Sequence, residues 1–123
     1  MKYLDLLTRV REAGQKAEAM KRELMNACES GKSGSSDTAS LKKRYMRFES
    51  EYRTLHNQAM EMIRASSDVE LMRAFFLRRV NRVPWEDIGR KILSNRSEME
   101  LRQVAYLYVK ANCDRMEAYS DCL

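Results

Sequence analysis

The sequence predicts an all-α fold, in which a long antiparallel helical hairpin of coiled-coil type is followed by a three-helix helix-turn-helix unit. Three observations predict it. The 123 residues include only four Gly and one Pro, too few for the many turns of a β-sandwich or barrel. The first half of the chain repeats apolar residues at alternating spacings of three and four, which is typical of helices packed along a seam. The second half contains three shorter helical patterns separated by turn signals.

Residues 2–29 are predicted to form one long helix. Two sets of positions seven residues apart carry apolar side chains over four unbroken heptads, the pattern of a helix that packs lengthwise on another. Several of these side chains are Ala, so a partner helix can approach closely. The two sets are Tyr3, Val10, Ala17 and Leu24, and Leu6, Ala13, Met20 and Ala27.

A second long helix is predicted over residues 38–66, after a Gly/Ser-rich loop at residues 30–40. Because the two seams are similar in length and the loop is short, we expect an antiparallel hairpin over residues 1–67. Two helices bury little apolar surface by themselves, so we expect a homodimer formed through the hairpin. The second seam comprises Leu41, Tyr45, Phe48, Tyr52, Leu55, Ala59 and Met62, and Ile63 widens it.

The helix-turn-helix unit is predicted at residues 68–112. Its first helix, residues 68–82, follows a break with potential N-caps at Ser66, Ser67 and Asp68. Its apolar side should contain Val69, Met72, Phe76 and Val80, with Phe75 beside them.

The second helix of the unit opens at Pro84, which suits a first helical turn, and extends to Ile92. We expect Trp85 to anchor the core and Gly89 to give room where the last helix crosses. In the following turn, residues 93–96, Asn95 is the residue best suited to a left-handed conformation. Residues 97–100 form a capping-box pattern, and the last helix, residues 98–112, should bury Leu101, Val104, Ala105, Tyr108 and Val109.

Composition and charge exclude several classes of protein. No apolar run approaches the roughly 18 residues that span a bilayer, and residues 1–5 show no signal-peptide pattern. Three Cys without CxxC spacing favour free thiols in a cytoplasm. We find no catalytic set and no metal-binding or cofactor-binding motif, so we expect neither an enzyme nor a bound metal or cofactor. The net charge of +5 divides into +4 over residues 1–67, +3 over 68–112 and −2 over a short acidic tail, 113–123.

Residues 71–109 resemble the C-terminal helix-turn-helix of small phage and prophage proteins, which is similar to region 4 of sigma-70 factors and to phage late-gene regulators. The likeness rests on residues 77–85, on Ile88 and Gly89, and on the segment Leu101-Arg102-Gln103. It implies a phage-type transcriptional regulator in the cytoplasm of a bacterial host, with the last helix in the major groove of double-stranded DNA. The expected base contacts are Arg96, Ser97, Glu98, Arg102, Gln103 and Tyr106, and the expected phosphate contacts are Arg78, Arg79, Arg82, Arg90 and Lys91.

A protein-binding function is the alternative. Glu98 and Glu100 near the start of the last helix would repel phosphates unless they accept hydrogen bonds from cytosine. The hairpin is also larger than DNA reading requires. The same fold could therefore serve a phage-encoded inhibitor that docks on an acidic surface of host machinery such as RNA polymerase or a CRISPR nuclease. A structural coiled-coil protein is a third possibility.

Overall fold

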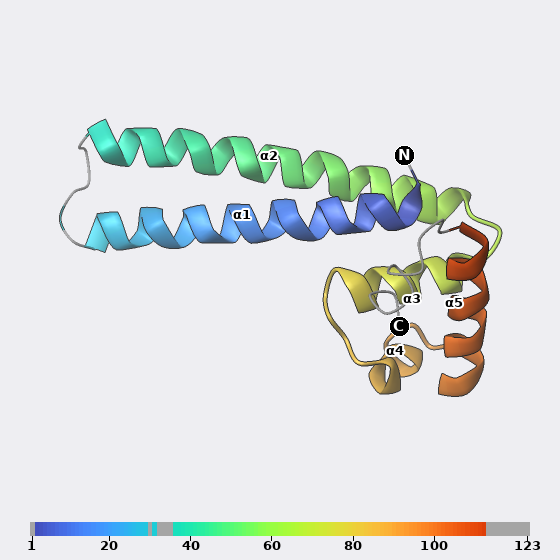
Figure 1. The fold of residues 1–123 in the computed structure, drawn as a ribbon. Helices are drawn as coiled ribbons and strands as arrows, with labels where there is room; N and C mark the ends of the chain where they lie inside the picture. Colours follow the sequence, from blue (N-terminus) through green and yellow to red (C-terminus); the bar gives the residue numbers. More distant parts are fainter. Residues whose placement is uncertain (1, 30, 32–35, 113–123) are drawn as a thin grey trace. The chain divides into compact units, whose positions relative to one another are not determined.

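The computed structural model describes residues 2–29, 31 and 36–112. These residues form five helices and no strand, which confirms the all-α prediction (Figure 1). The predicted acidic tail at 113–123 lies outside the described residues. The helices are α1 (Tyr3–Glu29), α2 (Ser36–Ala65), α3 (Val69–Arg79), α4 (Trp85–Lys91) and α5 (Glu98–Asn112).

The chain divides into two compact units, Met1–Met60 and Glu61–Leu123. The division falls inside α2, so the last turn of that helix belongs to the second unit. The sequence pattern changes slightly later, after Ser67, where the helical stripe breaks. None of the described helices is long and apolar enough to cross a membrane.

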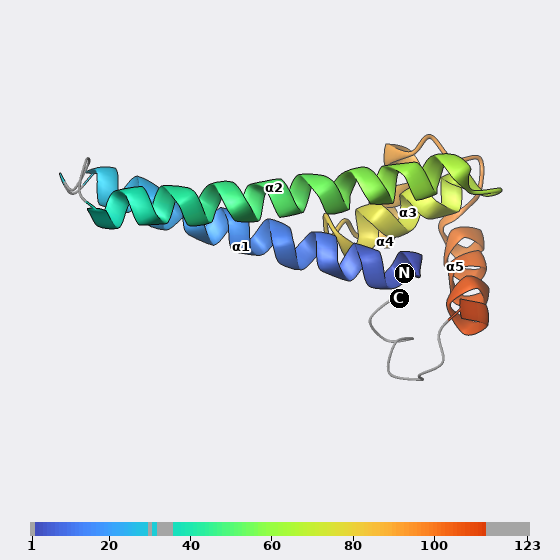
Figure 2. The ribbon, with the colours of Figure 1, turned by 90° about the horizontal axis from the view of Figure 1, so that it is seen from above.

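Helices α1 and α2 lie side by side and run in opposite directions in both views (Figures 1 and 2). The first three heptads of the α1 seam are buried, and the fourth, with Leu24 and Ala27, is half-buried. Gly14, which is not a seam residue, lies against Tyr52 of α2. A Cβ added at Gly14 would lie 3.2 Å from Tyr52 Cε2 and 3.3 Å from Tyr52 Cδ2, so the missing side chain makes room for the tyrosine ring.

The α2 seam is less completely covered than the α1 seam. Its aromatic residues Tyr45, Phe48 and Tyr52 are half-buried. The prediction that Met62 belongs to the seam is wrong, because this side chain is exposed, whereas the neighbouring Ile63 is buried.

Helix α3 begins at the predicted N-cap, because Asp68 Oδ1 accepts a hydrogen bond from the backbone N–H of Leu71 at 3.1 Å. The helix ends at Arg79, earlier than predicted. The inward position predicted for Val69 is wrong, since that residue is 41% exposed. Phe75 instead occupies the centre of the unit, fully buried, with its ring centroid 5.2 Å from that of Tyr108.

The turn after α4 adopts the hydrogen-bond pattern of a Schellman motif. The N–H of Leu93 bonds to the carbonyl of Arg90 at 3.3 Å, and the N–H of Ser94 bonds to that of Gly89 at 2.9 Å. The left-handed residue of this motif is Leu93, with φ of 54°, and not Asn95 as the sequence suggested. The position is fixed by where α4 ends, at Lys91 with Ile92 as the C-cap, so the left-handed conformation falls on Leu93, a residue with a Cβ.

Helix α5 starts at the predicted capping pattern and turns one side inward. Ser97 Oγ accepts a hydrogen bond from the N–H of Glu100 at 3.2 Å. Trp85 is buried as expected, and α3, α4 and α5 all contact one another. Gly89 is less crowded than expected, because an added Cβ would lie 3.7 Å from Leu101 Cδ1, an ordinary contact distance. The fully buried residues of α5 are Leu101, Ala105 and Val109.

Candidate nucleic-acid interface

The side of α5 that faces away from its buried residues is the strongest candidate for a contact surface. Five of its side chains recur at helical spacings of three and four and are exposed. Met99 is 81% exposed and Leu107 is 55% exposed, unusually high for large apolar residues in one short helix. We call these five residues the outer face of α5: Met99, Gln103, Tyr106, Leu107 and Lys110.

Of the six residues predicted to contact bases, Arg96 is half-buried and bound within the second unit. Its Nη2 atom donates to Asp68 Oδ2 at 3.1 Å, and its Nη1 atom lies 3.8 Å from Glu70 Oε1. The hydrogen bond to Asp68 raises the pKa of Arg96 above its ordinary value, against an opposing effect of burial. Arg96 therefore ties the turn before α5 to the first turn of α3.

Ser94 reinforces this connection between the turn and α3. Its Oγ atom accepts a hydrogen bond from the backbone N–H of Arg96 at 3.0 Å and donates one to Glu70 Oε1. The carboxylate of Glu70 thus contacts both Ser94 and the Arg96 guanidinium. Because these contacts fix the turn relative to α3, they also fix the position from which α5 starts.

Three other predicted base contacts are engaged along α5 itself. Ser97 caps the helix and donates from Oγ to Glu100 Oε1 at 3.3 Å. Arg102 Nη1 lies 3.6 Å from Glu98 Oε1, one turn away. The remaining two, Gln103 and Tyr106, lie on the outer face. The structure therefore places two of the six predicted residues together on the surface opposite the core.

The predicted phosphate contacts differ in exposure. Arg82, Arg90 and Lys91 are exposed, and Arg90 Nη2 bonds to Asp87 Oδ1 at 2.6 Å. Arg78 and Arg79 are half-buried. Arg78 Nη1 donates to the carbonyl of Val83 at 3.4 Å, which helps to hold the α3–α4 connection. Three of the five predicted cations are thus presented to solvent.

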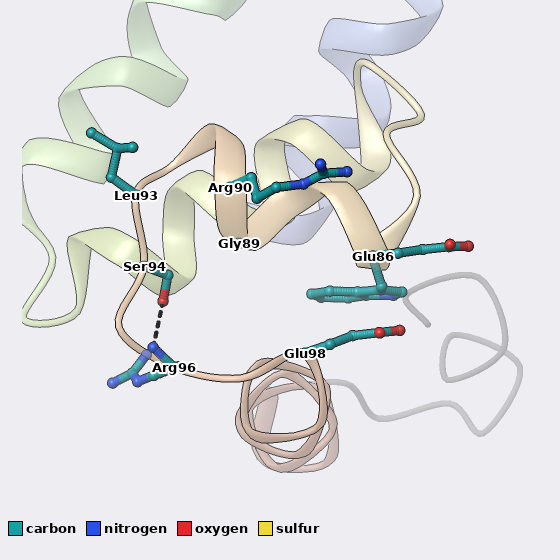
Figure 3. Close-up of a pocket in the computed structure, with 8 residues that line it drawn as sticks. Glu86, Gly89, Arg90, Leu93, Ser94, Arg96 and Glu98 are labelled. Atoms are coloured by element: carbon teal, nitrogen blue, oxygen red, sulfur yellow. Dashed lines mark hydrogen bonds between the residues drawn. The ribbon is translucent and has the colours of Figure 1, made fainter.

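An open groove of about 610 Å³ lies between α4 and the start of α5 (Figure 3). Arg90 and Arg96 line it together with the carboxylates of Glu86 and Glu98, which extend in the same direction in the close-up. Leu93 points away from those carboxylates and is 87% exposed. The groove carries both signs of charge, so it attracts neither anions nor cations strongly. Its other lining residues are Trp85, Gly89 and Ser94.

Sequence reasoning missed three residues of the outer face: Met99, Leu107 and Lys110. Their relation to Gln103 follows from helical geometry, because positions four before, four after and seven after a helical residue share its side. The apolar side chains were overlooked because residues that read bases are expected to be polar.

Comparison with protein-family models, with curated proteins and with solved structures finds no match to this chain.

Proposed function

We propose that the protein binds double-stranded DNA as a transcriptional regulator of phage type in a bacterial cytoplasm, with the outer face of α5 in the major groove. The observation that carries the proposal is the division of α5 into two sides. Leu101, Ala105 and Val109 are completely buried, while the opposite side is exposed along the whole helix. The major groove of DNA admits one α-helix, and the outward side chains of that helix read the edges of the bases.

The charges around α5 support the same function. Arg82, Lys91 and Lys110 are exposed and enter none of the ion pairs found among the described residues. Cations that form no ion pair within the described part of the chain can bind phosphates, whose neutralisation supplies most of the non-specific affinity for DNA. Arg96 and Ser94 fix the start of α5, because they connect the turn that precedes it to α3.

A salt titration tests this proposal. Fluorescence anisotropy of the full chain with a labelled 30-base-pair duplex should show affinity falling steeply as salt rises, by about 0.9 log units per log unit of salt for each phosphate contacted. Lys91→Ala should lower that slope by about 0.9. Lys21→Ala, which removes an exposed lysine of the hairpin, is the matched control and should leave the slope unchanged. No binding at low salt would refute the proposal.

The second candidate is a protein-binding inhibitor of host machinery, and the observation that favours it is Leu93. This residue has a strained, left-handed backbone conformation, and its apolar side chain is 87% exposed. Backbone strain of this kind is concentrated at functional sites, where it is retained for binding. If this function holds, purified bacterial RNA polymerase or a CRISPR nuclease should bind the chain, and Leu93→Asp should abolish that complex. A chain that binds duplex DNA and neither purified protein would exclude it.

We also propose that two copies associate through the hairpin, which would let the protein contact two half-sites. The half-buried aromatic residues Tyr45, Phe48 and Tyr52 of α2 leave apolar surface for a second copy to cover. Sedimentation equilibrium should then give twice the chain mass of 14.5 kDa. A monomer at micromolar concentration would contradict dimerisation.

A further inference from the structure

We propose that the outer face of α5 selects A·T base pairs, with Gln103 reading adenine and with Met99 and Leu107 contacting the methyl groups of thymine. This inference rests on the proposed function. The inference goes beyond the proposed function by naming the base pairs that the interface prefers and the side chains that read them.

Reading G·C pairs and reading A·T pairs require different side chains on α5. Arginine reads guanine, and a carboxylate accepts from the amino group of cytosine. Both kinds are present near the start of α5, but they pair with one another or with α3. Arg96 is bound to Asp68 at 3.1 Å, and Arg102 lies 3.6 Å from Glu98. Of the side chains suited to G·C pairs, Arg96 is therefore engaged within the protein, and Arg102 and Glu98 lie outside the outer face of α5.

The same holds for the second carboxylate, Glu100, which accepts a hydrogen bond from the Ser97 hydroxyl at 3.3 Å. Lys110 is exposed, but it stands in the last turn of α5, whereas a recognition helix contacts bases mainly from its N-terminal half. Lys110 is better placed for a phosphate. In the N-terminal and central turns the outer face then presents Tyr106 and three side chains suited to A·T pairs, Met99, Gln103 and Leu107.

The side chains suited to A·T pairs lie in a row along α5. Gln103 is exposed, and its amide can bond in a bidentate manner to N6 and N7 of adenine. Met99 precedes it by four residues and Leu107 follows it by four. Each such step advances about 6 Å along the helix and about 40° around it. The three side chains thus form a row about 12 Å long, comparable to three or four base-pair steps of about 3.4 Å.

A row with two apolar side chains suits DNA that contains thymine. The major-groove edge of thymine carries a methyl group, the one apolar group that base edges present there. Met99 and Leu107 are 81% and 55% exposed, so each can cover a methyl without any rearrangement of the core. Lys110 on the same face supplies charge complementary to the phosphates beside those bases.

Three duplexes of equal length test the inference with the full chain: alternating dA–dT, alternating dA–dU and alternating dG–dC. The dA–dU duplex keeps the hydrogen-bonding groups of dA–dT and lacks only the methyl. We expect dA–dT to bind at least about tenfold more tightly than dG–dC. We expect dA–dU to bind about fourfold more weakly than dA–dT for each thymine methyl that the protein covers.

Two variants assign the preference to residues. Met99→Ala should reduce the ratio of dA–dT to dA–dU affinity by about fourfold, and Gln103→Ala should reduce the preference for dA–dT over dG–dC. Met46→Ala is the matched control, because it removes a comparably exposed methionine from α2, and it should change neither ratio. All these positions are exposed, so the variants should fold.

The outcomes separate the inference from the function on which it rests. Equal affinity for the three duplexes, with steep salt dependence, would overturn the A·T preference and leave DNA binding intact. If Met99→Ala and Met46→Ala behaved alike, the contact between Met99 and the thymine methyl would be overturned. A chain that bound none of the duplexes at low salt would overturn both, and docking of the apolar outer face on a protein would then be favoured.

Discussion

Replacing Gly89 by Ala should stabilise the second unit. Gly89 lies in α4 with ordinary helical backbone angles, and an added Cβ would meet Leu101 Cδ1 at 3.7 Å and the Arg96 carbonyl oxygen at 4.0 Å. Both distances are normal van der Waals contacts, so nothing has to move. Ala is favoured over Gly inside a helix by about 0.8–1 kcal/mol. Because α4 is short and Gly89 is near its end, we expect a gain of about 0.5–1 kcal/mol.

Trp85 makes this gain measurable in the second unit alone. It is the only tryptophan of the chain and is 3% exposed, so its fluorescence reports the unfolding of α3, α4 and α5. Urea denaturation followed at this signal should give a higher midpoint for Gly89→Ala with an unchanged slope. Gly89→Leu is the companion variant and should be destabilising, because its longer side chain would overlap Leu101. A loss of stability in Gly89→Ala would refute the packing described between α4 and α5.

Three further substitutions test other contacts. Leu93→Gly should stabilise the second unit by about 0.5–1 kcal/mol in the same urea experiment, because relief of the left-handed conformation exceeds the entropy cost of glycine; an unchanged midpoint would contradict the strain. Gly14→Ala should lower the stability of the hairpin by about 1 kcal/mol in thermal unfolding followed by circular dichroism, because the new Cβ crowds Tyr52. In a Tyr52→Ala background the same change should instead stabilise, by about 1 kcal/mol; no change of sign would argue against the contact. Asp68→Asn should keep the cap of α3 and lose the ion pair with the partly exposed Arg96, at about 0.5 kcal/mol, whereas Asp68→Ala should cost about 1 kcal/mol more; equal losses would show that the cap contributes nothing.

The long helices could be predicted because their signal is periodic and repeated. Four heptads in α1 agree with one another, so an error at one position does not change the result. The caps at Asp68 and Ser97 could be predicted for a related reason, since they depend on residues three apart in sequence.

The side of α3 that faces the core could not be predicted in the same way. Leu71, Met72, Phe75 and Phe76 form an almost continuous apolar stretch, and its periodicity fits several orientations of an 11-residue helix. The choice of Phe75 over Val69 as a central residue depends on contacts with Tyr108, which lies far along the chain. The left-handed Leu93 was missed because residue preference favoured Asn95, while the end of α4 decides the position.

The candidate site was predictable only as a region. The sequence indicates that α5 carries it, but the pairing of Arg96 with Asp68 joins residues 28 positions apart, which no local pattern reveals. The Arg102–Glu98 pair, by contrast, has a spacing of four and could have been anticipated from helical geometry. The side chains available for contact on the outer face therefore depend on these pairings as well as on helical spacing.

The most direct test of the central claim, that the outer face of α5 enters a DNA groove, uses the methionine methyl groups as NMR probes. The full chain, with its methionine methyls labelled, is titrated with duplex DNA. If the outer face enters the groove, the Met99 resonance should shift, while those of Met25 and Met46, exposed on α1 and α2, should stay in place. Duplex binding that left Met99 unperturbed and shifted the hairpin methionines would contradict it.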